Sequence, residues 1–144
     1  TRNQRKAGRS GLLETDKGEA SMLNHRFKFY VPGTNGGVVI DRNLMSRMAD
    51  MVMDRFADMF GGATVTEAKG AWKNSAGVLV KEPVVLVESF TDEAGANWHT
   101  DDAFDLAAEV AGLMGQESVA LEVDDVLHLI SAKKVENQNA ALAA

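Results

Sequence analysis

The chain has 144 residues, a formal net charge of −6, no cysteine, and 45% hydrophobic against 25% charged residues. This composition is typical of a globular domain, and it excludes disulfides, thiolate metal ligands and cysteine nucleophiles. An acidic body repels phosphates, which weighs against nucleic acid binding outside the N-terminal arm. The sequence has no apolar run near the roughly 20 residues of a membrane helix and no secretory signal. We therefore expect a cytoplasmic protein, or one inside an assembled particle.

Residues 1–24 predict a basic N-terminal arm. They hold five basic side chains against three acidic ones and show no helical or strand periodicity. A polar segment of this kind is ordered only when it packs on its own body or on another chain. One interpretation is a solvated, flexible arm; the other is an arm that contacts neighbouring chains. We predict the second, with the interface residues Arg2, Arg5, Lys6 and Arg9.

The next segments predict a strand followed by a helix. Residues 26–32 alternate between polar and apolar side chains, which indicates a strand that ends at Pro32. After a glycine-rich loop, Asp41 is a good N-cap, and Gly61-Gly62 is a typical C-terminal stop. Apolar residues spaced three and four apart give the helix its buried face. They are Leu44, Met48, Met51, Val52, Phe56, Met59 and Phe60.

Five of the seven methionines lie on this predicted helix. Met45 and Met53 fall nearer the face opposite the buried one. Methionine is common at adaptable protein surfaces, and a second apolar stripe on a surface helix indicates a subunit contact. We therefore predict Met45 and Met53 as interface residues, with loose core filling as the alternative.

The rest of the chain predicts a hairpin, a helix and one or two further strands. Residues 61–87 are typical of two strands around the turn 74–77. Residues 88–97 are expected to form a polar connection, and a second helix is predicted from Thr100 or Asp101 to Gly115. Residues 118–123 alternate as a strand, Asp124-Asp125 indicates a turn, and residues 126–130 give a possible fifth strand. Residues 131–144 form an Ala-rich tail.

This order predicts an α+β fold of the ferredoxin-like, split βαβ kind, with two helices on one face of an antiparallel sheet. The domain is expected over residues 25–130, between the arm at 1–24 and the tail at 131–144. The other face of such a sheet must be solvated or covered by an arm, a tail or a partner.

Four motifs within residues 26–130 carry a family resemblance. They are Gly62-x-Thr64-Val65, Gly70-x-Trp72, Gly77-x-Leu79-Val80-Lys81-Glu82-Pro83 and Gly115-Gln116-Glu117-Ser118-Val119. Together they resemble a bacterial family of unknown function whose members include predicted small lipoproteins. The chain departs from those members because it has no lipid-bearing cysteine. The resemblance implies an α+β fold and no particular reaction.

No reactive constellation stands out in the sequence. The three histidines show no metal-ligand spacing, and no known metal or nucleophile motif is present. We therefore expect neither a metal site nor a cofactor. His99 lies beside acids and is a candidate general base, although we favour the interpretation of helix capping with a surface histidine. Glu88 is the other candidate catalytic residue, in a pocket with Trp72 and Trp98 as candidate ligand contacts.

Two functional hypotheses follow. The first is a non-enzymatic protein–protein interaction or assembly module, a homo-oligomer or part of a larger complex whose terminal arms contact neighbouring chains. Such a module would serve as an accessory component of a virion-like complex or as a small acidic inhibitor protein. The alternative is a cofactor-free enzyme or small-ligand-binding domain with a pocket near Trp72, Glu88, Trp98 and His99. We predict the first, because the sequence shows no reactive constellation.

Overall fold

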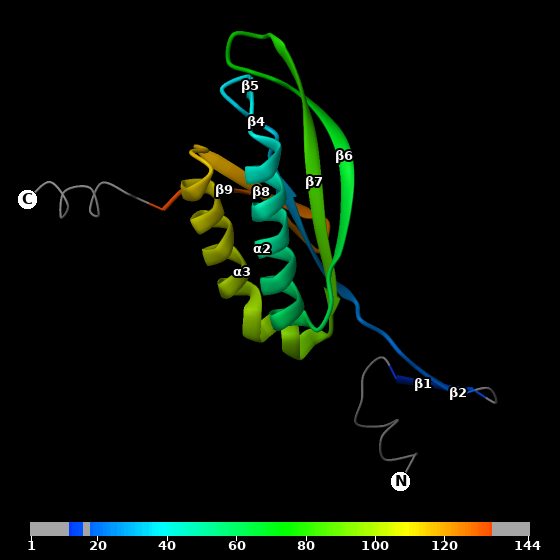
Figure 1. Cartoon of the computed structure of the whole chain (residues 1–144). Helices are drawn as coiled ribbons and strands as arrows, with labels where there is room; N and C mark the ends of the chain where they lie inside the picture. The colour runs from blue at the N-terminus through cyan, green and yellow to red at the C-terminus, as the bar shows by residue number, and fades with distance from the viewer. Residues whose placement is uncertain (1–11, 16–17, 134–144) are drawn as a thin grey trace, which may run out of the picture.

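The computed structural model describes residues 12–15 and 18–133, and within these ranges no helix is long and apolar enough to cross a membrane. Two helices, α2 (Arg42–Phe60) and α3 (Glu93–Leu113), pack side by side against a sheet (Figure 1). The strands are β1 (Leu12–Thr15), β2 (Gly18–Ser21), β3 (His25–Val31), β4 (Thr34–Asn35), β5 (Val38–Val39), β6 (Thr64–Lys73), β7 (Leu79–Thr91), β8 (Ser118–Val123) and β9 (Val126–Ser131).

The main sheet has five antiparallel strands in the order β6-β7-β3-β8-β9. The chain order β3, α2, β6, β7, α3, β8 and the central place of β3 next to β7 and β8 are those of a ferredoxin-like fold. The predicted fold class is therefore confirmed, and β9 is the predicted fifth strand. Both helices lie on one face of the sheet (Figure 1), so the other face is left open by the described elements.

The core lies between the helices and one face of β3. Phe27, Phe29 and Val31 are fully buried there, because successive side chains of a strand point to opposite faces. Phe29 meets Phe56 of α2 edge to face, with ring centroids 6.5 Å apart. Burying an aromatic side chain of this size contributes on the order of 2 kcal/mol.

Helix α2 has the predicted boundaries. The Asp41 side chain accepts a hydrogen bond from the backbone N–H of Asn43 at 2.7 Å, and Gly61 ends the helix in the left-handed conformation. The predicted interface role of Met45 is wrong, because Met45 is only 6% exposed and belongs to the core. The buried row runs through positions 45, 49, 52, 56 and 60, one step around the helix from the predicted stripe. Met53 is partly buried against the same core.

Helix α3 begins earlier than the sequence predicts. Strand β7 continues to Thr91, and Asp92 caps α3 by accepting a hydrogen bond from the Gly95 N–H at 2.8 Å. The expected polar connection at 88–97 is therefore wrong. A side chain at position 95 would clash with the Thr91 hydroxyl oxygen. The glycine is required by the close approach of the helix to the strand end.

The described parts of the N-terminal segment form a β1–β2 hairpin, where no regular structure was expected. Arg2, Arg5, Lys6 and Arg9 lie outside the described residues, as does the tail beyond Lys133. The interface role predicted for the four basic residues therefore stays a prediction.

Candidate functional site

The open face of the sheet carries a group of charged side chains at its centre. Arg26, Lys28 and Tyr30 alternate with the buried residues of β3 and so point away from the helices. The strand register sets Lys28 opposite Glu88 of β7 on one side and Glu122 of β8 on the other. Three neighbouring strands therefore bring polar groups together on a surface that the helices leave uncovered.

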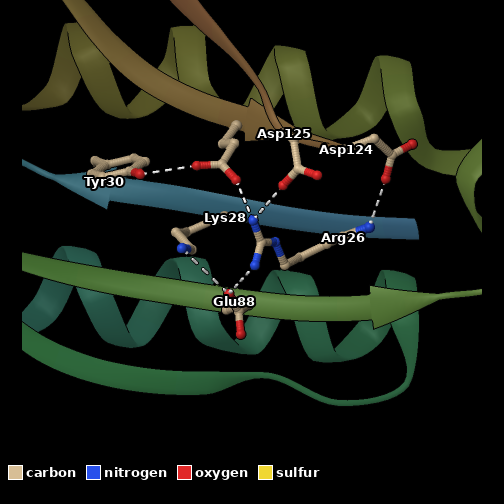
Figure 2. Close-up of polar contacts among 7 residues, drawn as sticks. Arg26, Lys28, Tyr30, Glu88, Asp124 and Asp125 are labelled. Carbon is tan, nitrogen blue, oxygen red and sulfur yellow. Dashed lines mark hydrogen bonds and ion pairs between the residues drawn. The ribbon is translucent and has the colours of Figure 1, made fainter. Parts of the chain in front are cut away.

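Arg26 holds this group together (Figure 2). Its Nη2 donates to Glu122 Oε2 at 2.5 Å and to Asp125 Oδ1 at 2.8 Å, and its Nη1 lies 3.8 Å from Glu88 Oε2. One guanidinium thus bridges β7, β3 and the β8–β9 turn. Arginine suits this role because its planar fork presents several donors at fixed angles.

Two further contacts complete what we call the Arg26 cluster. Lys28 Nζ lies 3.6 Å from Glu88 Oε2, and the Tyr30 hydroxyl donates to Glu122 Oε1 at 3.0 Å. The cluster therefore holds three carboxylates against two cations, a formal charge of −1. Its members are Arg26, Lys28, Tyr30, Glu88, Glu122 and Asp125.

The contacts shift the pKa values of three members of the cluster. The hydrogen bond with Glu122 raises the pKa of Arg26 above its ordinary value. Burial, with the bond to Glu122, raises the pKa of Tyr30, so the phenol keeps its proton. Burial alone would raise the pKa of Glu122, but the hydrogen bonds from Tyr30 and Arg26 outweigh it and the pKa is lowered. Glu122 is therefore a carboxylate and a weak base.

The β8–β9 turn anchors the cluster beside the start of β3. Asp124 and Asp125 have φ angles of 50° and 69°, a left-handed conformation that costs most residues other than glycine roughly 1–2 kcal/mol and that Asp and Asn adopt more readily. In return, Asp124 Oδ1 accepts from the Arg26 N–H at 2.8 Å, and Asp124 Oδ2 lies 2.6 Å from His25 Nδ1. Burial alone would raise the pKa of Asp124, but the hydrogen bonds with His25 and Arg26 outweigh burial, and the pKa is lowered. The predicted turn is confirmed.

Apolar surface and a hollow adjoin the cluster. Phe90 pairs with Arg26 across the sheet, Leu127 pairs with Glu122, and both side chains are about half exposed. A hollow of about 590 Å³ lies where β6 begins, with Glu88 and Phe90 in its wall beside the end of α2 at Phe60. Charged and apolar surfaces therefore meet at Glu88.

The four predicted pocket residues are not brought together. Trp98 and His99 lie on α3, where Trp98 is 79% exposed and His99 Nδ1 lies 3.0 Å from Asp102 Oδ2. His99 lines a different hollow, between the two helices. Trp72 pairs with Val80, eight residues along β7 from Glu88, which is about 26 Å at 3.3 Å per residue.

Of the predicted candidates, Glu88 alone belongs to the Arg26 cluster. Sequence reasoning treated Arg26, Lys28 and Tyr30 only as strand residues. A signal was present, because polar side chains at every second position of a central strand mark its open face. Across residues 12–15 and 18–133, there is no group of three or more His, Asp or Glu side chains that could hold a metal ion.

Comparison with solved structures finds the same fold in an enzyme. A phage SAM lyase in its apo state matches with a TM-score of 0.59 and 18% identity, over 77% of this chain and 91% of the lyase. A phage SAM lyase in complex with S-methyl-5'-thioadenosine matches with a TM-score of 0.55 and 17% identity, over 75% and 89%. At this identity the likeness establishes the fold alone.

CutA from Synechococcus elongatus matches over 90% of this chain and 91% of its own, with 10% identity and a TM-score of 0.46 that is too low to support an argument. No family model and no curated protein matches the chain. The predicted lipoprotein-family resemblance, protein partner and homo-oligomer therefore stay predictions.

The predicted non-enzymatic assembly module is contradicted by the two lyase structures, which share the fold over about nine-tenths of their length and are enzymes. The sequence argument failed because it looked for a reactive motif within a short stretch of chain. The Arg26 cluster instead joins side chains from residues 26–30, 88 and 122–125.

Proposed function

We propose that the chain is a lyase that cleaves S-adenosylmethionine (SAM) at the Arg26 cluster, releasing S-methyl-5'-thioadenosine. The observation that carries the proposal is a net negative cluster, with apolar margins, on the open face of a fold shared with SAM lyases. The shared fold points to the class of reaction, and the side chains of the Arg26 cluster are the groups that would act on SAM.

Charge complementarity supports SAM as the substrate. At neutral pH the molecule carries a sulfonium, an ammonium and a carboxylate, which gives a net charge of +1 beside a neutral adenosine. Glu88 and Glu122 suit the cationic groups, and Arg26 and Lys28 suit the substrate carboxylate. A cluster with a formal charge of −1 therefore favours the sulfonium over a neutral thioether such as S-adenosylhomocysteine.

The reaction breaks the bond between the sulfonium sulfur and the γ-carbon of the amino acid chain. Both electrons of that bond stay on the sulfur, which becomes the neutral thioether of S-methyl-5'-thioadenosine. The four-carbon fragment can close through attack of its own carboxylate on the γ-carbon, which gives homoserine lactone without a proton transfer. It can instead lose a β-proton to a base, which leaves an alkene.

The cluster favours ring closure. The lowered pKa of Glu122 makes it a weak base, and Glu88 is held by Lys28 and Arg26. Carboxylates tied to cations can stabilise the sulfonium but are poorly suited to remove a proton. The expected products are thus S-methyl-5'-thioadenosine and homoserine lactone, with no water, metal or co-reactant consumed.

The test is incubation of the purified chain with SAM at low salt, with chromatography of the adenosine products and NMR of the four-carbon product. NMR is needed because the lactone and the alkene have the same elemental composition. Glu88→Gln should lower kcat/KM about 100-fold, as removal of one preorganised electrostatic group does. Glu109→Gln, on the helix side in a pair with Arg55, is the matched control and should leave the rate unchanged.

Absence of S-methyl-5'-thioadenosine beyond the rate in buffer alone would refute the proposal. Equal rates for Glu88→Gln and the wild type would place the reaction elsewhere on the molecule. Circular dichroism of both variants shows whether a lost rate reflects lost folding.

A further inference from the structure

We propose that the hollow between the end of α2 and Glu88 is the subsite for the thioadenosine half of SAM, and that it orients the sulfonium toward Glu88. This inference rests on the proposed function, since it divides the substrate between two neighbouring surfaces. The amino acid half then lies on the Arg26 cluster, and the nucleoside half lies in the hollow of about 590 Å³.

The walls of the hollow suit a flat purine. Phe60 is held in place by stacking on Phe27, with ring centroids 4.4 Å apart, and Phe90, on the open face of β7, is 48% exposed. Leu23 adds apolar surface from the chain before β3. Bases stack on aromatic side chains largely without regard to sequence, and the half-exposed ring of Phe90 is available for an adenine to stack on.

Backbone without side chains forms another wall. Gly61 and Gly62 line the hollow, and a Cβ added at either would meet no atom within 4 Å. The Ser89 hydroxyl donates to the Gly62 carbonyl oxygen at 2.6 Å, which fixes this loop against β7. A side chain at either glycine would extend into open space, and the bond from Ser89 holds this part of the wall in place before any ligand arrives.

The electrostatic features of the hollow suit a sulfonium at its edge. Helix α2 ends at Phe60 and has no basic side chain in its last turn, so its C-terminal carbonyl groups leave a partial negative charge. Glu88 lines the hollow from the opposite element and also contacts Lys28 in the cluster. A cation between the nucleoside and amino acid halves of the ligand would therefore meet negative charge from both sides.

Two other hollows in the described chain lack this combination. The hollow between the helices, of about 410 Å³, is lined by Asp58, Asp102, Asp105 and Glu109 with His99 and no Phe, Tyr or Trp. The hollow at the start of α2, of about 610 Å³, has Leu44 as its only large apolar residue. All three fall within about 300–1,000 Å³, the usual size of ligand pockets, so the lining and not the size distinguishes the hollow beside Glu88.

The test is binding of S-methyl-5'-thioadenosine itself, measured by isothermal titration calorimetry on the full chain. Phe90→Ala removes the exposed aromatic face and should weaken binding about tenfold, in line with the loss of one stacked base. Gly62→Leu fills the hollow and should weaken it at least as much. Gly112→Leu is the matched control, because an added side chain there also meets no atom within 4 Å and the position lies on α3.

Lys28→Met separates the two halves of the substrate, because Lys28 belongs to the Arg26 cluster but does not line the hollow. It should leave the affinity for neutral S-methyl-5'-thioadenosine within about twofold of the wild type, while it lowers SAM turnover. Equal affinity of the wild type and both hollow variants, or no binding by the wild type, overturns the subsite.

The outcomes also distinguish the subsite from the proposed reaction. Binding that depends on Phe90 and Gly62 without any SAM cleavage supports the subsite and refutes the lyase. SAM cleavage that neither hollow variant alters supports the lyase and refutes the subsite.

Discussion

The same seven residues form both faces of β3, yet one face belongs to the core and the other carries the candidate site. Phe27 and Phe29 point into the core beneath the helices, while Arg26 and Lys28 point to the open face. A strand alternates sides at every residue, so stability and chemistry can be assigned to adjacent positions. The candidate site therefore lies directly on a strand whose other face is fully buried in the core.

The largest expected effect comes from comparing two single substitutions, one on each face of β3. Phe29→Ala should lower the free energy of unfolding by about 3–5 kcal/mol, because it leaves a cavity against Phe56. Lys28→Met, one position away, should change that free energy by less than about 1 kcal/mol while it reduces SAM cleavage. Urea denaturation and product chromatography measure the two quantities. Comparable losses of stability in both variants would contradict the assignment of different roles to the two faces of β3.

A smaller effect is expected at the β8–β9 turn. Asp125→Gly relieves the left-handed strain, so the free energy of unfolding should stay equal or rise by up to about 1 kcal/mol. It also removes one acceptor of Arg26, so SAM cleavage should fall several-fold. Asn tolerates this conformation and keeps an oxygen acceptor, so Asp125→Asn should recover part of the rate. A glycine variant that is both more stable and fully active would show that the turn does not position Arg26.

The smallest effect is the response to acid. Glu122 and Asp124 have lowered pKa values in the folded chain, so the unfolded chain binds their protons more readily. Their contribution to stability should be complete above the ordinary carboxyl pKa of about 4 and should be lost as pH falls below it. Urea midpoints between pH 6 and pH 3 measure this. Glu122→Gln should flatten the decline and Glu109→Gln should not; identical slopes would contradict the assignment.

The fold was predictable where a local pattern decides the structure. The alternation at residues 26–32, the Asp41 cap and the Gly61 stop each reflect the geometry of one element, and each was correct. The prediction for Met45 is wrong because the helix has apolar residues over a wide face. Which part of that face is buried depends on what the helix packs against. The start of α3 was misplaced because Gly95 serves a contact with Thr91, which only the packed structure contains.

Most of the candidate site lay beyond sequence reasoning for a related reason. Arg26 reaches Glu122 and Asp125 across 96 and 99 residues of chain, through the strand order and register of the sheet. No spacing of residues along the sequence indicates that these side chains are in contact. Glu88 is a candidate from sequence, but it is grouped there with Trp98 and His99, which lie on α3, and with Trp72, which lies eight residue pairs away along the sheet.

Tyr30 is the only tyrosine of the chain, and its hydroxyl donates to a carboxylate of the Arg26 cluster. The absorbance change of a phenol on ionisation is therefore an intrinsic optical reporter of this one location. An alkaline titration followed by ultraviolet difference spectroscopy would give a single transition, displaced to high pH by the burial and the bond to Glu122. Ligand arrival on the open face can thus be followed in the unlabelled, unmutated protein.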